Sequence, residues 1–140
     1  MIDLHSHFLP GIDDGAKNVD DSISMLKDAF SQGVTLCAAT PHCVLNRENT
    51  VENFITLRQQ AAEMLFSSPL FDDKSIPKIV RGAEVYLSHD ISEYDGVKQL
   101  CYENTDYMLL ELSARNDAAA ISEWIYNLII KVTGRRSCYL

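Results

Sequence analysis

Residues 1–16 read MIDLHSHFLPGIDDGA and carry the strongest signal in the chain. A short apolar run ends in His5 and His7, which are separated by one residue. In an extended strand, side chains at positions i and i+2 point to the same side. The two imidazoles therefore share one space, and such a pair can hold a divalent cation. The alternative for an H-x-H pair by itself is a polar strand end with two solvated histidines.

The loop that follows the histidines adds acidic groups and turn residues. Asp13 and Asp14 can supply oxygen ligands, and Gly11 and Gly15 let the loop bend back toward the strand end. The candidate cation site therefore extends beyond the two histidines.

Composition limits the class of protein. The chain has 140 residues, a net charge of -8 and 46% hydrophobic residues, which fits one globular domain with a core. The acidic balance disfavours nucleic acid and anionic membrane surfaces as partners, although bound cations would still allow an anionic substrate. No apolar run approaches the ~20 residues of a membrane span, and the N-terminus lacks a signal-peptide pattern. We therefore expect a cytoplasmic chain whose four cysteines are reduced thiols.

Apolar periodicity predicts strands that alternate with helices. The predicted strands are Ile2 to His5 (buried), Val34 to Thr40, Lys78 to Leu87 and Tyr107 to Leu112, and a fifth starts at Ser137 to Leu140. Helices are expected from Asn18 or Asp20 to about Gln32, from Thr50 or Val51 onward, within Ser88 to Glu103, and over Ala118 to Val132 after a cap at Asn116 or Asp117. The first helix is expected to bury Val19, Ile23, Leu26 and Phe30, and the second Phe54, Leu57, Ala61, Met64 and Leu65.

Repeated units of this kind predict an α/β fold with a parallel sheet and right-handed crossovers. The chain is shorter than the ~250 residues of an eight-fold barrel. We interpret it as part of a larger barrel, with a small open sheet of four or five strands as the structural alternative.

Polar side chains gather at the predicted carboxyl ends of the strands, where parallel α/β folds place their sites. His5 and His7 follow the first strand and His42 the second, while Glu84 and Glu111 come late in the third and fourth. Both glutamates have apolar neighbours, and a carboxylate there is costly unless it is paired or metal-bound. Each alone could be an edge carboxylate or an ion pair, but together the five predict a metal centre. Mixed histidine and carboxylate ligands suit Mn, Fe or Zn.

Hydrolysis is the chemistry that such a centre supports, because a metal-activated water is a nucleophile at neutral pH. Arg47 and Arg81 could hold phosphate oxygens, with a solvated surface position as the alternative for each. Cysteine-based catalysis is rejected. The thiolate phosphatase loop needs five residues between cysteine and arginine, but only three separate Cys43 from Arg47, and no glycine is present to cradle a phosphate.

Four blocks of the sequence resemble a known family. They are the run from His5 to Ala16, then Ala39-Thr40-Pro41-His42, then Gly82-Ala83-Glu84-Val85-Tyr86, and finally Leu110-Glu111. In this order they are similar to the PHP-type metal-dependent phosphoesterases. Within that group they resemble the bacterial manganese-dependent tyrosine-protein phosphatases of capsular and extracellular polysaccharide synthesis.

The resemblance implies a partial PHP-type distorted TIM-like barrel with up to three metals, Mn²⁺ in the first place and Fe or Zn as alternatives. It implies hydrolysis of phosphotyrosine on a bacterial tyrosine kinase, and the charge and hydropathy above argue against nucleic acid and membrane insertion. By position, His5 and His7 would bind one metal, Glu84 would bridge two, and Glu111 would bind the second. Asp14 and His42 would serve the third metal or the substrate as catalytic residues, and Arg47 is the substrate-binding candidate.

The later strands of this family carry an H-P-E-R-Y-like segment and an Asp-x-His pair, whereas no histidine follows Glu111 here. We therefore expect residues 1–140 to form a single, incomplete PHP domain, the N-terminal half to two-thirds of the family's length. Two alternatives stay open. One is a phosphoesterase for a small ester such as histidinol phosphate, and the other is an inactive truncated fragment that binds metal or a partner, including a second copy of itself.

Overall fold

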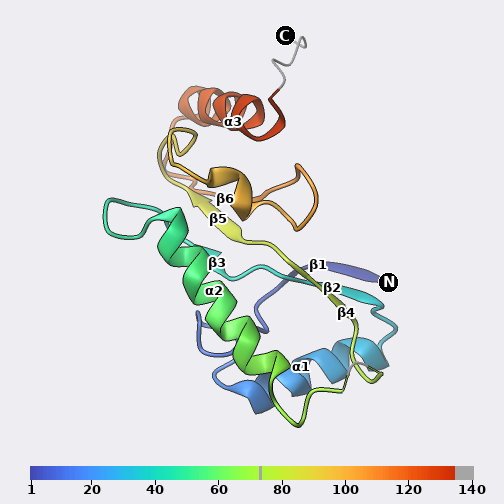
Figure 1. The fold of residues 1–140 in the computed structure, drawn as a ribbon. Helices are drawn as coiled ribbons and strands as arrows, with labels where there is room; N and C mark the ends of the chain where they lie inside the picture. Colours follow the sequence, from blue (N-terminus) through green and yellow to red (C-terminus); the bar gives the residue numbers. More distant parts are fainter. Residues whose placement is uncertain (73, 135–140) are drawn as a thin grey trace.

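The computed structural model describes residues 1–72 and 74–134, and Figure 1 shows their path. The strands are β1 (Ile2–Ser6), β2 (Leu36–Ala39), β3 (His42–Cys43), β4 (Lys78–Arg81), β5 (Glu84–Leu87) and β6 (Leu109–Leu112). The helices are α1 (Val19–Ser31), α2 (Val51–Phe66), the short 3-10 helix η1 (Val97–Leu100) and α3 (Ala118–Thr133). The predicted fifth strand at Ser137 to Leu140 lies outside the described residues. Among those described, no helix is long and apolar enough to cross a membrane.

All paired strands are parallel, as predicted, but they form two sheets rather than one. One sheet has the order β1-β2-β4 and the other the order β3-β5-β6. The chain passes directly from β2 into β3 and from β4 into β5, so the second sheet continues the first beyond its carboxyl edge (Figure 1). The described strands thus form four segments that lie side by side in chain order: β1, then β2 with β3, then β4 with β5, and finally β6.

The prediction of one unbroken strand from Lys78 to Leu87 is wrong, because the segment breaks at Gly82–Ala83. Gly82 donates its N–H to the Ala39 carbonyl at 2.8 Å, while Glu84 donates to Pro41 at 3.0 Å. A Cβ on Gly82 would lie 2.9 Å from a ring carbon of Tyr102, so this close approach requires glycine. On the neighbouring segment, Pro41 lacks the N–H that would continue the ladder.

The helix boundaries follow their predicted caps. Asn18 accepts from the backbone N–H of Asp21, Thr50 from that of Asn53, and Asp117 from those of Ala119 and Ala120. These side chains satisfy donors that the first turn of a helix leaves unpaired. The predicted buried faces are only partly right: Ile23, Leu26, Phe54, Ala61 and Leu65 are buried, but Phe30, Leu57 and Met64 are exposed.

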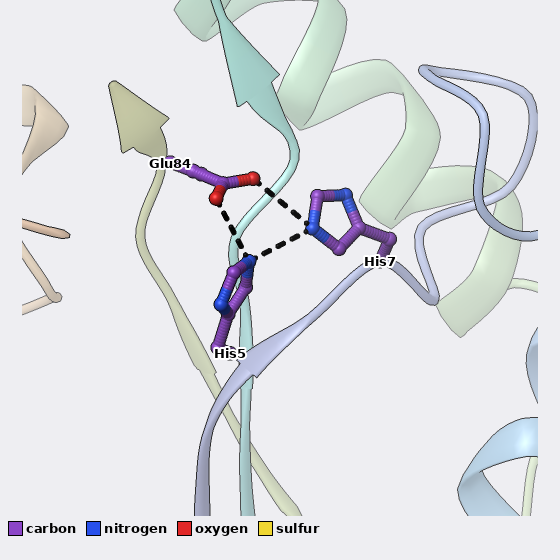
Figure 2. A group of neighbouring side chains, drawn as sticks. All are labelled: His5, His7 and Glu84. Carbon is purple, nitrogen blue, oxygen red and sulfur yellow. Dashed lines mark hydrogen bonds and ion pairs between the residues drawn. The ribbon is translucent and has the colours of Figure 1, made fainter. Parts of the chain in front are cut away.

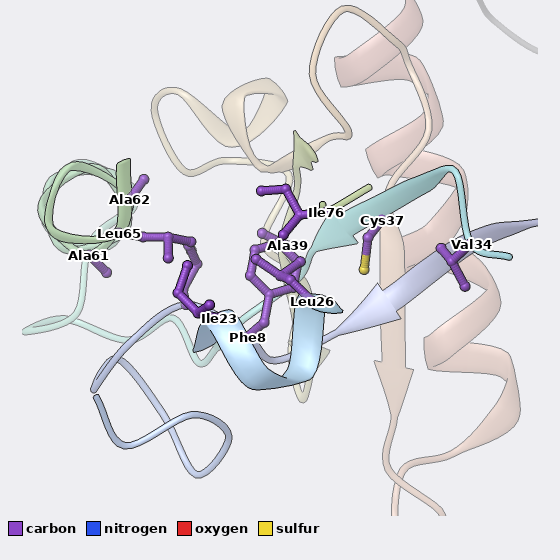
Figure 3. Close-up of a cluster of buried hydrophobic side chains, with 11 residues drawn as sticks. Phe8, Ile23, Leu26, Val34, Cys37, Ala39, Ala61, Ala62, Leu65 and Ile76 are labelled. Carbon is purple, nitrogen blue, oxygen red and sulfur yellow. The ribbon is translucent and has the colours of Figure 1, made fainter. Parts of the chain in front are cut away.

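Two apolar clusters hold the elements together, one under each sheet. In the first, α1 and α2 pack Ile23, Leu26 and Leu65 around Phe8, which is fully buried (Figure 3). The second joins β3, β5, α3 and the segment around η1 through residues that include Val85, Leu100 and Leu128. The Phe8-Leu9 dipeptide is buried directly behind His7, so the first cluster fixes the start of the loop that follows β1.

Strand β1 is an outer strand, and its predicted burial is wrong. Ile2 and Leu4 are 60% and 56% exposed. The Tyr102 hydroxyl donates to the Leu4 carbonyl at 2.7 Å and ties β1 to a segment almost 100 residues away. Cys37, Cys43 and Cys101 are buried free thiols, whereas Cys138 lies outside the described residues.

The Arg81–Glu103 ion pair joins the loop after η1 to β4. The hydrogen bond from Arg81 holds the pKa of Glu103 below its ordinary value. A lowered pKa in the folded state stabilises the protein above the unfolded pKa, and this contribution is lost as the pH falls through the folded value. Both side chains are partly exposed, so Glu103→Gln should lower the free energy of unfolding by about 0–1 kcal/mol at pH 7.

Urea unfolding at pH 7 and at pH 3 checks this prediction. The difference between wild type and Glu103→Gln should shrink at pH 3. Glu93→Gln, at an exposed position without an ion pair to any described residue, is the matched control. A difference that grows as the pH falls would contradict the assignment.

Candidate metal centre

Three histidines converge on one buried glutamate where the two sheets meet. His5 comes from β1, His7 follows it, and Glu84 is the first residue of β5 (Figure 2). His5 Nε2 lies 3.2 Å from Glu84 Oε1, and His7 Nε2 lies 3.3 Å from Glu84 Oε2. His42 Nδ1 approaches the same Oε2 at 3.0 Å. One carboxylate that is 10% exposed therefore faces three imidazoles.

The strand register explains why the remaining members share this face. His42 pairs with Glu84, and Glu111 pairs with Tyr86, two residues further along β5. Side chains two residues apart on a strand point the same way, so His42, Glu84 and Glu111 lie on one face. His42 Nδ1 is 3.8 Å from Glu111 Oε2 on one side, and His42 Nε2 is 3.5 Å from Asp14 Oδ1 on the other.

The sequence predicts Glu84 late in a continuous third strand, but this strand is broken and Glu84 lies after the break. It follows the carboxyl end of β4 and begins β5. The site therefore occupies the junction between the sheets, at the carboxyl edge of the first sheet rather than of a single continuous one.

Asp13 is not one of the side chains that face the shared space, but it holds two of them in position. Its carboxylate is 5% exposed and accepts from His7 Nδ1 at 2.8 Å, from the His42 backbone N–H at 3.1 Å and from the Gly15 N–H at 3.0 Å. Burial opposes ionisation, but the hydrogen bonds with His7, Gly15 and His42 outweigh it and lower the pKa of Asp13. From the sequence, Asp13 and Asp14 can both supply oxygen ligands. Spacing alone does not distinguish a carboxylate that binds the metal from one that orients a metal-binding histidine.

The hydrogen bond to Asp13 determines which nitrogen of His7 is free. A carboxylate only accepts, so His7 Nδ1 carries the proton, and in the neutral ring Nε2 keeps its lone pair. That lone pair faces Glu84 Oε2, a buried oxygen that accepts no hydrogen bond although His7 and His42 both lie close to it. His7 Nε2 and Glu84 Oε2 can both donate a lone pair to a cation that lies between them. A carboxylate that accepts a hydrogen bond from the other ring nitrogen, as Asp13 does here, is common at histidine metal ligands.

Three sets of side chains have ligand atoms close enough to share an ion. They are His5, His7 and Glu84; His7, Asp14 and His42; and His42, Glu84 and Glu111, and within each set the atoms lie within 4.8 Å of one another. The four carboxylates around the cluster have only histidines as ion-pair partners within the described chain. The donors and the charge both fit divalent cations such as Mn, Fe or Zn.

All six predicted metal and catalytic residues come together in this cluster: His5, His7, Asp14, His42, Glu84 and Glu111. Arg47 does not join it. Arg47 is exposed in the loop between β3 and α2, and makes no hydrogen bond or ion pair with any described residue.

A separate hollow of about 520 Å³ between α2 and residues 97–106 contains cations that are already engaged. Arg81 pairs with Glu103, and Lys98 with Asp106 at 2.8 Å. Arg58 donates to the Gly82 and Gln99 carbonyls at 2.6 and 3.2 Å. In this structure, Arg81 and Arg58 thus contact other parts of the chain, and Arg81 pairs with Glu103 rather than lying with the metal-ligand candidates.

These features define the class of protein: a parallel β/α fold with a candidate multinuclear metal centre. The chain belongs to the capsular polysaccharide synthesis family CpsB/CapC, whose model matches residues 1–134. It is 28% identical over 135 residues to the tyrosine-protein phosphatase CpsB of Streptococcus agalactiae, covering 93% of this chain and 52% of that protein. It is 30% identical over 132 residues to the tyrosine-protein phosphatase YwqE of Bacillus subtilis, covering 94% and 50%.

A solved structure shows the same fold. It comes from crystal structures of YwqE from Bacillus subtilis and CpsB from Streptococcus pneumoniae, described as unique metal-dependent tyrosine phosphatases. The TM-score is 0.68 at 27% identity, with 94% of this chain and 52% of that chain covered. The chain thus spans about half the length of the relatives that it matches.

Gly15 supplies a test of the loop geometry. A Cβ at this position would lie 2.0 Å from the His7 carbonyl oxygen and 2.5 Å from the His7 Cβ, so Gly15→Ala must push His7 away. We expect the dissociation constant for Mn²⁺ to rise about 10–100-fold, the usual effect of disturbing the support of a metal ligand. Competition with a chelating dye measures it. Gly33→Ala, which changes a glycine far from the cluster, should leave metal affinity unchanged, and equal affinities for all three proteins would contradict the assignment.

Cys43 supplies a second test, because burial raises the pKa of its thiol to about 12 despite the nearby Arg58 charge. The thiol therefore stays protonated at pH 8, and a protonated thiol is a poor nucleophile. Iodoacetamide at pH 8 should leave Cys43 unmodified in the folded protein and alkylate it in denaturant, as read by peptide mass spectrometry. Stoichiometric alkylation of Cys43 in the folded chain would reopen cysteine-based chemistry.

Proposed function

We propose that this chain carries the metal centre of a phosphatase that hydrolyses phosphotyrosine on a protein. The observation behind the proposal is Glu84, a buried carboxylate that faces nitrogens of three histidines while its Oε2 accepts no hydrogen bond. Relatives named tyrosine-protein phosphatases support the reaction class. Because the chain spans about half of their length, the activity of residues 1–140 alone is part of the proposal.

In this proposal, His5 and His7 would hold a first ion and Glu111 a second, while Glu84 would contribute to holding both. Asp14 and His42 serve the third ion or the substrate. When bound, the metals supply a nucleophilic water and positive charge for the phosphoryl group. Mn²⁺ is the proposed metal, and the same donors accept Fe or Zn.

The chain's own groups orient these ligands and the substrate. Asp13 keeps the proton on His7 Nδ1 and leaves Nε2 free, and it also holds the His42 backbone. The Asp14 side chain is 81% exposed and lies at the open side of the cluster, where substrate arrives. Arg47, free of other partners among the described residues, remains our candidate for binding phosphate oxygens.

The proposed protein substrate is a bacterial tyrosine kinase, in keeping with the capsular polysaccharide synthesis family. The proposed location is the cytoplasm, because a kinase substrate is phosphorylated where ATP is available.

Metal binding and phosphate release measured together test the proposal. Wild type with Mn²⁺ should release phosphate from a phosphotyrosyl peptide, faster than from histidinol phosphate. His7→Ala should lower kcat/KM at least about 100-fold and weaken Mn²⁺ binding, because His7 belongs to two of the three sets. Asp28→Ala, at an exposed position on α1, is the control and should change neither. Metal binding without phosphate release would overturn the proposal for residues 1–140.

A further inference from the structure

A small apolar hollow opens next to the metal centre. It has a volume of about 230 Å³ and lies between the loop after β3 and helix α2. Its walls include Ile12, His42, Val44, Leu45, Phe54 and Leu57.

His42 connects this hollow with the cluster. Its imidazole lies 3.0 Å from Glu84 Oε2 and 3.5 Å from Asp14 Oδ1, and the same residue lines the hollow. Ile12 lines the hollow directly before Asp13 and Asp14 in the chain. A phosphate ester held at the cluster therefore has an apolar surface within its immediate surroundings.

The chemistry of the walls selects the kind of group that fits. Among the described residues, no lysine or arginine lines the hollow, so its walls lack the permanent cations that a phosphate prefers. Val44 and Leu57 are 50% and 56% exposed, so their side chains have apolar surface that a ligand can cover. An apolar cavity of roughly 150 Å³ accepts a benzene ring, and this hollow is larger.

Two amides provide polar groups beside the apolar walls. Asn49 and Asn53 also line the hollow, and within the described chain the Asn49 side chain makes no hydrogen bond. An amide can donate to a peptide carbonyl and accept from a peptide N–H. An aromatic ring attached to a peptide can therefore contact the apolar walls, while the peptide groups can hydrogen-bond to the amides.

We propose that this hollow receives the aromatic ring of the phosphotyrosyl side chain while its phosphate lies at the metal centre. The proposal rests on the phosphatase function proposed above and adds the residues that recognise the ring. Val44 and Leu57 then determine the preference for aryl over alkyl phosphates, and the short side chains of phosphoserine leave the hollow empty.

Binding of p-cresol without any metal tests the hollow separately from catalysis. In methyl-labelled wild type, p-cresol should shift the methyl resonances of Ile12, Val44, Leu45 and Leu57. Leu57→Asp should weaken this binding at least about 5-fold. Met64→Asp is the matched control, because Met64 lies on the same helix, is 52% exposed and does not line the hollow. Unchanged methyl resonances at saturating p-cresol would overturn the proposal.

Kinetics supply the second measurement. Leu57→Asp should raise KM for a phosphotyrosyl peptide about 10-fold with kcat nearly unchanged, and Met64→Asp should leave both at wild-type values. Val44→Asp, in the loop instead of the helix, should repeat the effect of Leu57→Asp. Phosphate release with KM unchanged in both hollow variants would overturn the hollow and leave the phosphatase proposal standing. Shifts with p-cresol but no phosphate release would support the hollow and count against the phosphatase proposal.

Discussion

The buried carboxylate of Asp13 is the constraint on which the candidate metal centre depends. It accepts hydrogen bonds from the His7 ring and from the backbones of Gly15 and His42, and so joins the loop after β1 to the start of β3. Without it, the His7 ring could turn and the loop could move away from the second sheet. Its burial makes these bonds matter more, because a buried carboxylate without partners is costly.

Much of the fold could be predicted from local patterns. Asn18, Thr50 and Asp117 mark helix starts through capping, which depends on neighbouring residues only, and apolar periodicity indicates the parallel β/α order. The break at Gly82 could not be predicted, because the tight contact with the ring of Tyr102, 20 residues further along, and the pairing with the segment at Pro41 are visible only in the folded chain. The exposure of β1 was missed for a similar reason: burial depends on which strands lie next to one another, and no local pattern records this.

The candidate site divides in the same way. His5, His7, Glu84 and Glu111 could be proposed from spacing because each lies on or beside a strand, where the direction of a side chain follows from its position. Asp13 and Asp14 lie in a loop, where adjacent residues have no fixed direction, and only the structure separates the buried acceptor from the exposed neighbour. The hollow beside His42 combines a loop with a helix, so its walls could not be seen in either segment alone.

The cluster draws its side chains from residues 5 to 111 and from both sheets. Only the folded chain brings the complete set together, so an ion that needs all of these ligands favours the folded state. By mass action, such an ion adds at most about 2.7 kcal/mol to the free energy of unfolding at 100 times its dissociation constant, and less to the extent that the nearby His5 and His7 also bind it in the unfolded chain. Divalent metal supply would then govern how much of this chain survives proteolysis in the cell, quite apart from any turnover at the site.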